Sequence, residues 1–217
     1  TFDNGKEGSF EQAREEQNEP KLLIKEKATD QAHIALGVRA FPLNDKRREI
    51  LDLLATLLGA EKSSRMFQEV RDKLGLAYYI GTEPTYYGDV GYLATFAGVN
   101  IDNIDLAIKT ILREYQRVSE EGVGEKELFQ AKEYIKGRLL IELESSFHMA
   151  RLVGSKELLL KERESLSEYF SRLDMITKED ICRVAKEIFK PEHLNLAIIG
   201  PFNHRERFTK LLNLDHR

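Results

Sequence analysis

Apolar residues alternate with polar or small ones in the first strongly patterned region of the chain. From Gln31 to Phe41 every second residue is apolar, a period of two that predicts a strand buried on one face. A less regular strand is expected from Lys21 to Lys27, and a short buried strand from Leu194 to Gly200, where Pro201 stops it. Strands are thus predicted near both ends of the sequence.

Two further β-rich runs lie close together in the middle of the chain. They extend from Tyr78 to Tyr86 and from Val90 to Val99, and the residues between them include Gly88 and Asp89. Glycine and aspartate readily adopt the backbone conformations of tight turns, so the two runs predict an antiparallel hairpin.

Helical periodicity dominates the remaining sequence. From Asn44, a candidate N-cap, to Gly59 the apolar residues recur at helical spacing and predict an amphipathic helix. A second helix is expected from Ser63 to Gly75, a glycine in the usual C-terminal position. Residues 101 to about 188 are helical in pattern almost throughout, and residues 208–212 predict a last short helix. The buried side of the second helix is expected to carry Met66, Phe67, Val70 and Leu74.

The order of these elements favours an α+β fold, in which an antiparallel β-sheet is covered by helices on one face. A doubly wound parallel sheet would instead alternate strand and helix along the whole chain. Residues 21–217 are predicted to form a single α+β domain. Residues 1–20 are polar, rich in Glu and Gln and without a period, so we interpret them as a linker or the tail of a preceding domain.

Charge and cysteine content exclude several classes of function. Lys and Arg number 33 against 37 Asp and Glu, a net charge of −4 with both signs interspersed, which argues against a nucleic-acid partner. The single cysteine, Cys182, cannot form an intramolecular disulfide. No apolar run approaches the roughly 20 residues that span a bilayer. We expect a cytoplasmic protein without a transmembrane segment. We also expect the chain to be a fragment of a longer protein, because the sequence begins at Thr1 rather than Met.

Neither metal ligands nor a nucleophile can be identified in the sequence. No histidine has a second His or a Cys at the spacing that places two ligands on one helical face. Glu144 and His148 are four residues apart, which is more typical of a solvated helix contact, and His33 is interpreted as a strand residue on the polar face of the sheet. There is no G-x-S-x-G elbow, and Cys182 has no histidine close in sequence. We therefore predict no metal site within this chain.

One helix-to-strand junction stands out. Arg71 lies in the last turn of the second predicted helix, Gly75 turns the chain, and Tyr78 opens the following strand. A cation near a helix C-terminus is favoured by the helix dipole by about 0.3 to 1 kcal/mol. The residue types are thus compatible with a capping arginine and a half-buried strand tyrosine, and a structural interpretation stands beside a functional one.

The junction also carries a family resemblance. The segment Ser63-Ser-Arg-Met-Phe-Gln-Glu-Val-Arg-Asp-Lys-Leu-Gly-Leu-Ala-Tyr78 is similar to a signature in the second domain of insulinase/pitrilysin-type zinc peptidases, which include the mitochondrial processing peptidases. Residues 27–37 resemble the strand that opens these domains, and residues 194–200 resemble their closing strand. The resemblance covers approximately residues 20 to 201 and implies the α+β fold of LuxS/processing-peptidase-like metallohydrolases.

In that family each polypeptide carries two similarly folded domains, and the first binds zinc through an H-x-x-E-H helix and a further Glu. The resemblance identifies this chain as the second, zinc-less domain, and implies zinc in a homologous partner domain, in the same or another chain. It implies that Arg71 and Tyr78 reach over an enclosed chamber to the substrate and stabilise the oxyanion. Tyr79 and Tyr86 are further candidates for substrate binding. The expected substrate is a peptide or unfolded polypeptide, and we expect an oligomer.

Two other functions remain open from the sequence. The same fold could serve as an inactive structural or assembly subunit, as in the core proteins of respiratory complexes that belong to this family. It could also serve as a stand-alone peptide-binding domain without a catalytic partner. Under the leading hypothesis, this chain alone is inactive and forms part of a zinc metalloendopeptidase.

Overall fold

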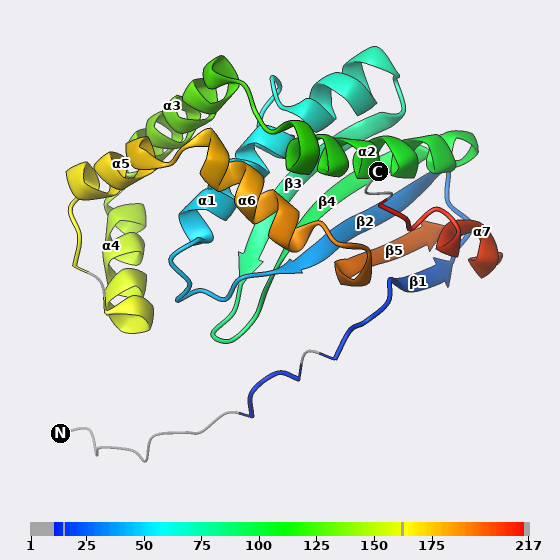
Figure 1. Ribbon diagram of the computed structural model, residues 1–217, viewed down its shortest axis with the longest axis horizontal. Helices are drawn as coiled ribbons and strands as arrows, with labels where there is room; N and C mark the ends of the chain where they lie inside the picture. Colours follow the sequence, from blue (N-terminus) through cyan, green and yellow to red (C-terminus); the bar gives the residue numbers. More distant parts are fainter. Residues whose placement is uncertain (1–10, 15, 162, 215–217) are drawn as a thin grey trace.

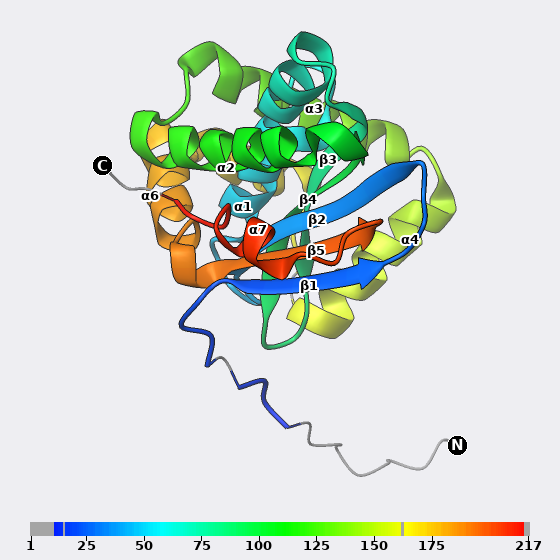
Figure 2. The same cartoon turned by 90° about the vertical axis from the view of Figure 1, so that its right-hand side faces the viewer.

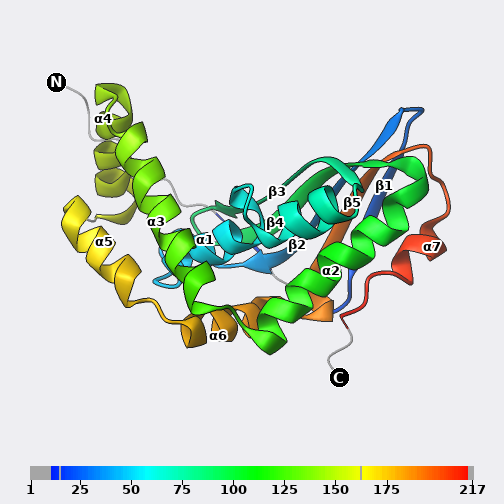
Figure 3. The ribbon, with the colours of Figure 1, turned by 90° about the horizontal axis from the view of Figure 1, so that it is seen from above.

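A single five-stranded sheet organises the molecule, in the order β1-β5-β2-β4-β3. The computed structural model describes residues 11–14, 16–161 and 163–214. Helices α1, α2 and α6 cover one face of the sheet (Figures 1 and 3). The strands are β1 (Lys21–Glu26), β2 (Gln31–Ala40), β3 (Ala77–Tyr86), β4 (Gly91–Asn100) and β5 (Leu194–Gly200).

The helical segments follow the predicted order closely. Three of them are π-helical (η1, η2 and η4) and two are 3₁₀ (η3 and η5). Their bounds are α1 (Arg48–Ala55), η1 (Thr56–Ala60), η2 (Phe67–Lys73), η3 (Ile101–Asn103), α2 (Ile104–Glu121), α3 (Glu125–Glu142), α4 (Ser146–Ser155), η4 (Lys156–Leu160), α5 (Leu166–Met175), α6 (Lys178–Ile188), η5 (Pro191–His193) and α7 (Arg205–Thr209).

The α+β class with helices on one face of the sheet is confirmed, but the sheet is mixed rather than wholly antiparallel. Strand β1 runs parallel to β5, while the β5–β2, β2–β4 and β4–β3 pairs are antiparallel. The last strand inserts between the first two, as Figure 2 shows. A pairing between the two ends of the sequence leaves no local signal, which is why the alternation pattern did not reveal its direction.

The core lies between the sheet and the helices α1, α2 and α6. Tyr115 of α2 is fully buried there, and its ring stacks on that of Phe189 with the centroids 4.3 Å apart. Its hydroxyl donates to the carbonyl oxygen of Leu36 in β2 at 3.0 Å and lies 2.7 Å from the hydroxyl of Thr95 in β4. These contacts fix α2 against the centre of the sheet.

Several local predictions are corrected. Asn44 is not an N-cap, because Asp45 accepts a hydrogen bond from the backbone N–H of Arg47 at 2.8 Å and forms a turn, so that α1 begins only at Arg48. Leu74 was expected on the buried side of its helix but is 44% exposed. The last helix begins at Arg205, earlier than the sequence pattern indicated.

The predicted hairpin is confirmed as β3 and β4, whose turn is closed by a hydrogen bond from the backbone N–H of Tyr87 to the oxygen of Val90 at 2.8 Å. Beyond the β3 edge stand α3, α4 and α5 (Figures 1 and 3). Within the described part of the chain, no helix is long and apolar enough to cross a membrane.

The segment before β1 is held against the sheet. The side-chain amide of Gln17 donates to the backbone oxygen of Leu194 at 3.0 Å, and its oxygen accepts from Arg39 and Asn195, each at 3.1 Å. The predicted linker over residues 1–20 stays a prediction, and residues 1–10 and 15 lie outside the described residues.

Candidate functional site

Arg71 lies in the last turn of η2, at the end of the sheet where β3 begins. Its guanidinium carbon sits 4.7 Å from the centroid of the Phe67 ring, close enough for a cation–π contact. The residue is exposed, and within the described residues its guanidinium has no ion-pair or hydrogen-bond partner. All of its donors therefore remain available to a ligand.

The chain turns sharply between Arg71 and Tyr78. Gly75 has a φ of +60°, a left-handed conformation that costs a residue with a side chain roughly 1 to 2 kcal/mol. Its N–H donates to the backbone oxygen of Arg71 at 3.1 Å, which closes the helix. Glycine is thus the residue that lets the chain pass from η2 directly into β3, as the sequence predicted.

Tyr78 occupies a β-bulge. Ala77 pairs with Val99 and Tyr79 pairs with Gly98, so Tyr78 is the extra residue on β3 and has no register partner on β4. Its side chain is 75% exposed, and no group within the described residues hydrogen-bonds its hydroxyl. Arg71 and Tyr78 thus both lie exposed at one helix-to-strand junction.

The two other candidate tyrosines lie on opposite faces of the sheet. Tyr79 lies on the face that α1, α2 and α6 leave uncovered, which we call the open face; there its ring covers Gly98. Tyr86 lies on the covered face, where its hydroxyl donates to Asp52 Oδ1 of α1 at 2.6 Å. The structure therefore does not bring Tyr79 and Tyr86 together in one cavity, and their role in substrate binding stays a prediction.

Asp52, the hydrogen-bond partner of Tyr86, has a shifted pKa. Burial raises the pKa of Asp52 to about 6, although the hydrogen bond from Tyr86 acts to lower it. Burial and the adjacent carboxyl of Asp52 together raise the pKa of the Tyr86 hydroxyl above its usual value. The pair joins α1 to β3 and has the character of a structural contact on the covered face.

His33 contacts one of the candidate tyrosines. The sequence predicted that His33 lies on the polar face of the sheet, but it did not predict a contact with a tyrosine. Its Nδ1 lies 3.0 Å from the hydroxyl of Tyr79, and the two rings are stacked with an interplanar angle of 28°. The alternation of β2 correctly predicted that His33 faces away from the covered core. Its contact with Tyr79 depends on strand order, which the sequence does not reveal.

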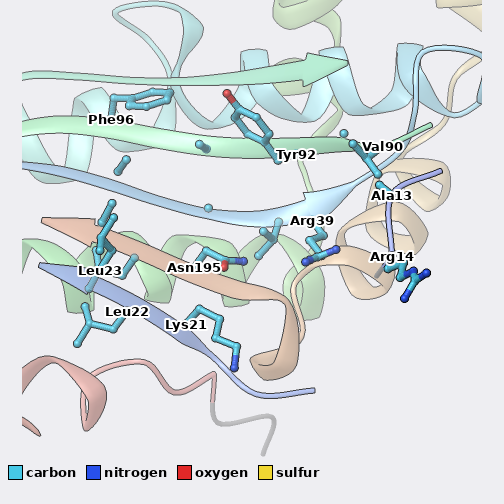
Figure 4. A pocket seen from close by; sticks show the side chains of 17 residues that line it. Ala13, Arg14, Lys21, Leu22, Leu23, Arg39, Val90, Tyr92, Phe96 and Asn195 are labelled. Atoms are coloured by element: carbon cyan, nitrogen blue, oxygen red, sulfur yellow. The ribbon is translucent and has the colours of Figure 1, made fainter. Parts of the chain in front are cut away.

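Two hollows lie along the sheet, and Tyr79 lines the second of them. On the open face a hollow of about 680 Å³ has a floor of small and apolar side chains, with Arg14, Lys21 and Arg39 at its rim (Figure 4). Its floor and walls include Leu23, Ala35, Gly37, Ala94, Phe96 and Ala197. A second hollow of about 600 Å³ follows β3 from Tyr79 to Pro84, and Ile135 and Arg138 of α3 form part of its lining. Since β3 is at the edge of the sheet, this hollow lies along a strand that pairs on one side only.

No group of three or more His, Cys, Asp or Glu side chains in the described residues could hold a metal ion. The donors of the described residues therefore do not fit a catalytic zinc site, which requires three protein ligands. Cys182 is partly buried in α6, and its thiol donates to the backbone oxygen of Ser119 at 3.2 Å.

Comparison with known proteins assigns the chain to a family. The family described as "Peptidase M16 inactive domain" matches residues 2–135, which is more than half of the chain. The chain belongs to this family. The expected resemblance to the zinc-less domain of insulinase-type peptidases is thereby confirmed.

Curated relatives support the same assignment. The chain is 32% identical over 179 residues to an uncharacterized zinc protease of Bacillus subtilis, covering 82% of this chain and 44% of the relative. It is 30% identical over 178 residues to an uncharacterized zinc protease of Streptomyces coelicolor, covering 82% of this chain and 39% of the relative. The chain thus spans less than half the length of these curated relatives.

Solved structures share the fold. A protease from Helicobacter pylori superposes with a TM-score of 0.84 at 23% identity, covering 92% of this chain and 49% of that chain. A peptidase M16 inactive domain from Pseudomonas fluorescens has a TM-score of 0.80 at 17% identity, covering 90% and 47%. At these identities the likeness concerns the fold alone.

Proposed function

We propose that this domain is the substrate-binding and transition-state-assisting half of a zinc metalloendopeptidase. Its zinc-binding partner is a homologous domain in the same or another chain, and the substrate is a peptide or unfolded polypeptide. In this proposal Arg71 and Tyr78 contact the substrate, and the two domains enclose the chamber in which cleavage occurs. A cytoplasmic location and an oligomeric state stay predictions.

The proposal is supported mainly by the exposure of Arg71 and Tyr78. A guanidinium and a phenol lie exposed at the same junction, and neither has a hydrogen-bond partner within the described residues. A capping arginine would bond the last carbonyls of its helix, and a structural tyrosine would bury most of its ring. Both side chains are instead available to a group outside this domain.

The chemistry of peptide cleavage gives these groups a role. Attack on a peptide carbonyl places negative charge on its oxygen, and donors fixed in advance around that oxygen stabilise the transition state. Arg71 would supply a cation and Tyr78 a hydroxyl donor. Removing one donor of this kind typically costs ~2.7 to 4 kcal/mol, or roughly 10²- to 10³-fold in kcat.

Substrate binding is supported by the β3 edge. The hollow that follows Tyr79 to Pro84 adjoins an edge strand, which can pair with an extended peptide through its backbone where η1 does not cover it, as Gly59 does at the backbone N of Thr82. Backbone pairing reads little side-chain information, so it suits a broad range of peptides. Pro84 carries no N–H, which limits the length of strand that can pair fully.

The test uses the intact protein, including its zinc-binding partner domain, with a fluorogenic peptide library. Arg71→Ala and Tyr78→Phe should each lower kcat by roughly 10²- to 10³-fold. Arg113→Ala in α2 and Tyr87→Phe in the hairpin turn are matched controls at other exposed positions, and should retain wild-type turnover.

Wild-type kcat in both Arg71→Ala and Tyr78→Phe would refute the proposed roles. An intact protein that cleaves no peptide, whatever residue stands at position 71, would favour the inactive assembly subunit. Peptide binding without cleavage in any pairing would instead favour a stand-alone peptide-binding domain.

A further inference from the structure

Three residues form a row across neighbouring strands on the open face. Tyr79 of β3 pairs with Gly98 of β4, and Gly98 pairs with His33 of β2. The three positions therefore lie side by side, perpendicular to the strands, one residue beyond the bulge at Tyr78. The row is unusual because its middle residue, a glycine, has no side chain.

Gly98 allows the outer two residues to meet. A Cβ atom at position 98 would lie 2.4 Å from Cε1 and 2.9 Å from Cδ1 of Tyr79, distances that real Cβ contacts do not show. The Tyr79 ring therefore lies over the glycine, with its Cδ1–Cε1 edge closest, and reaches across β4. Its hydroxyl ends 3.0 Å from Nδ1 of His33.

The contact restrains one side of the bulge. A bulge interrupts the ladder of backbone hydrogen bonds, so the direction of its extra side chain depends on how the flanking residues are held. On one side Ala77 is buried against the core at 7% exposure. On the other side Tyr79 is held on the open face by the row, although its own side chain is 41% exposed.

We infer that His33 is a positioning residue for Tyr78: by holding Tyr79 across Gly98, it fixes the bulge and directs the Tyr78 phenol away from the sheet. The inference rests on the proposed function of Tyr78 and adds a residue two strands away. His33 itself does not contact the substrate. Its contribution is the alignment of a donor, and misalignment of a catalytic group lowers kcat more than it weakens binding.

The activity test measures kcat and KM of the intact protein for His33→Phe and Tyr79→Phe. Each should lower kcat by roughly 2- to 10-fold, the equivalent of one lost hydrogen bond, with little change in KM. His33→Asn should restore most of kcat, because the asparagine amide oxygen occupies nearly the position of Nδ1. His204→Phe, an exposed histidine beside α7, is the matched control and should leave kcat unchanged.

A second arm separates positioning from a general structural effect. In a Tyr78→Phe background, His33→Phe should cause no further loss of kcat, because there is no hydroxyl left to align. An equal further loss in that background would overturn the inference, and so would wild-type kcat in His33→Phe. If the single variant Tyr78→Phe retains wild-type kcat, the proposed role of Tyr78 fails instead.

A spectroscopic arm decides the positioning independently of catalysis. With 3-fluorotyrosine at position 78 of the intact protein, the ¹⁹F resonance should shift or broaden in His33→Phe and remain unchanged in His204→Phe. An unchanged resonance in His33→Phe would overturn the inference even if activity falls. Thermal unfolding should change little in either variant, because His33 is exposed.

Discussion

On the covered face of the sheet, two tyrosine hydroxyls have hydrogen-bond partners within the chain. At the junction between η2 and β3, a tyrosine hydroxyl has no such partner within the described residues. Tyr115 bonds Leu36 and lies beside Thr95, and Tyr86 bonds Asp52. Tyr78, by contrast, is 75% exposed. Tyrosine thus occurs in this sheet both with its hydroxyl hydrogen-bonded inside the protein and with its hydroxyl exposed to solvent.

The physical reason is desolvation. A buried hydroxyl without a partner costs about 1 to 3 kcal/mol, so a tyrosine in the core has to be paired and then contributes to stability. An exposed hydroxyl is solvated by water and contributes little to folding, but it can exchange that water for a ligand. Stability and activity should therefore depend on different sets of residues, and three measurements test this separation.

The largest effect on stability is expected for Phe189→Ala. The ring is fully buried and stacks on Tyr115, so its removal should lower the free energy of unfolding by about 3 to 5 kcal/mol in urea titrations. Leu23→Ala is the control on the open face, where the side chain is 67% exposed; it should change stability by less than about 0.5 kcal/mol. Equal losses in the two variants would contradict the comparison.

A pH-dependent effect is expected from Asp52. Its pKa in the folded state, about 6, lies above its ordinary value, so the folded protein holds this proton more tightly than the unfolded chain. The stability that the proton confers is complete below about pH 4, and up to about 3 kcal/mol is lost as the pH rises to about 6. Asp52→Asn should lack this loss and be more stable than wild type above pH 6.

The measurement is the difference in free energy of unfolding between wild type and Asp52→Asn from pH 4 to pH 8. Other carboxyls cancel in this difference. Asp45 is one of them, since its hydrogen bond with Arg47 lowers its pKa and gives the opposite pH trend. A difference that does not vary with pH would show that Asp52 does not titrate in this range.

A smaller effect is expected for Tyr115→Phe. The change removes a hydroxyl that bonds the Leu36 carbonyl and lies beside Thr95, and should lower the free energy of unfolding by roughly 1 to 2 kcal/mol. Tyr78→Phe removes the same atom from an exposed ring and should lower it by less than about 0.5 kcal/mol. Thermal and urea unfolding of the two variants test this directly, and a destabilised Tyr78→Phe protein would assign that residue to the fold.

Much of the fold could be predicted because its signals are local. The hairpin of β3 and β4 follows from two β-rich runs around Gly88 and Asp89, and Gly75 marks the end of its helix as expected. The parallel pairing of β1 with β5 could not be predicted, since the two strands lie at opposite ends of the sequence. Leu74 was misplaced because it is the C-cap residue that follows η2, a π-helix whose turns do not keep the 3.6-residue period.

The candidate site was predictable in part. Arg71 and Tyr78 came from a motif, and the structure leaves both exposed at one junction. Tyr79 and Tyr86 were grouped although odd and even positions of a strand face opposite sides, so alternation alone could have separated them. The bulge at Tyr78 and the contact of Tyr79 with His33 depend on register between strands, which a single sequence does not encode visibly.

The insertion of β5 between β1 and β2 has a consequence for synthesis of the chain. During translation β1 emerges long before β5, the strand that pairs with it. Until β5 is synthesised, β1 and the side of β2 that faces β5 have unpaired backbone N–H and C=O groups. A polypeptide truncated before Leu194 would keep both of these edges open, and open edges recruit other chains. Nascent or shortened forms of this domain should therefore depend on chaperones until the final strand closes the sheet.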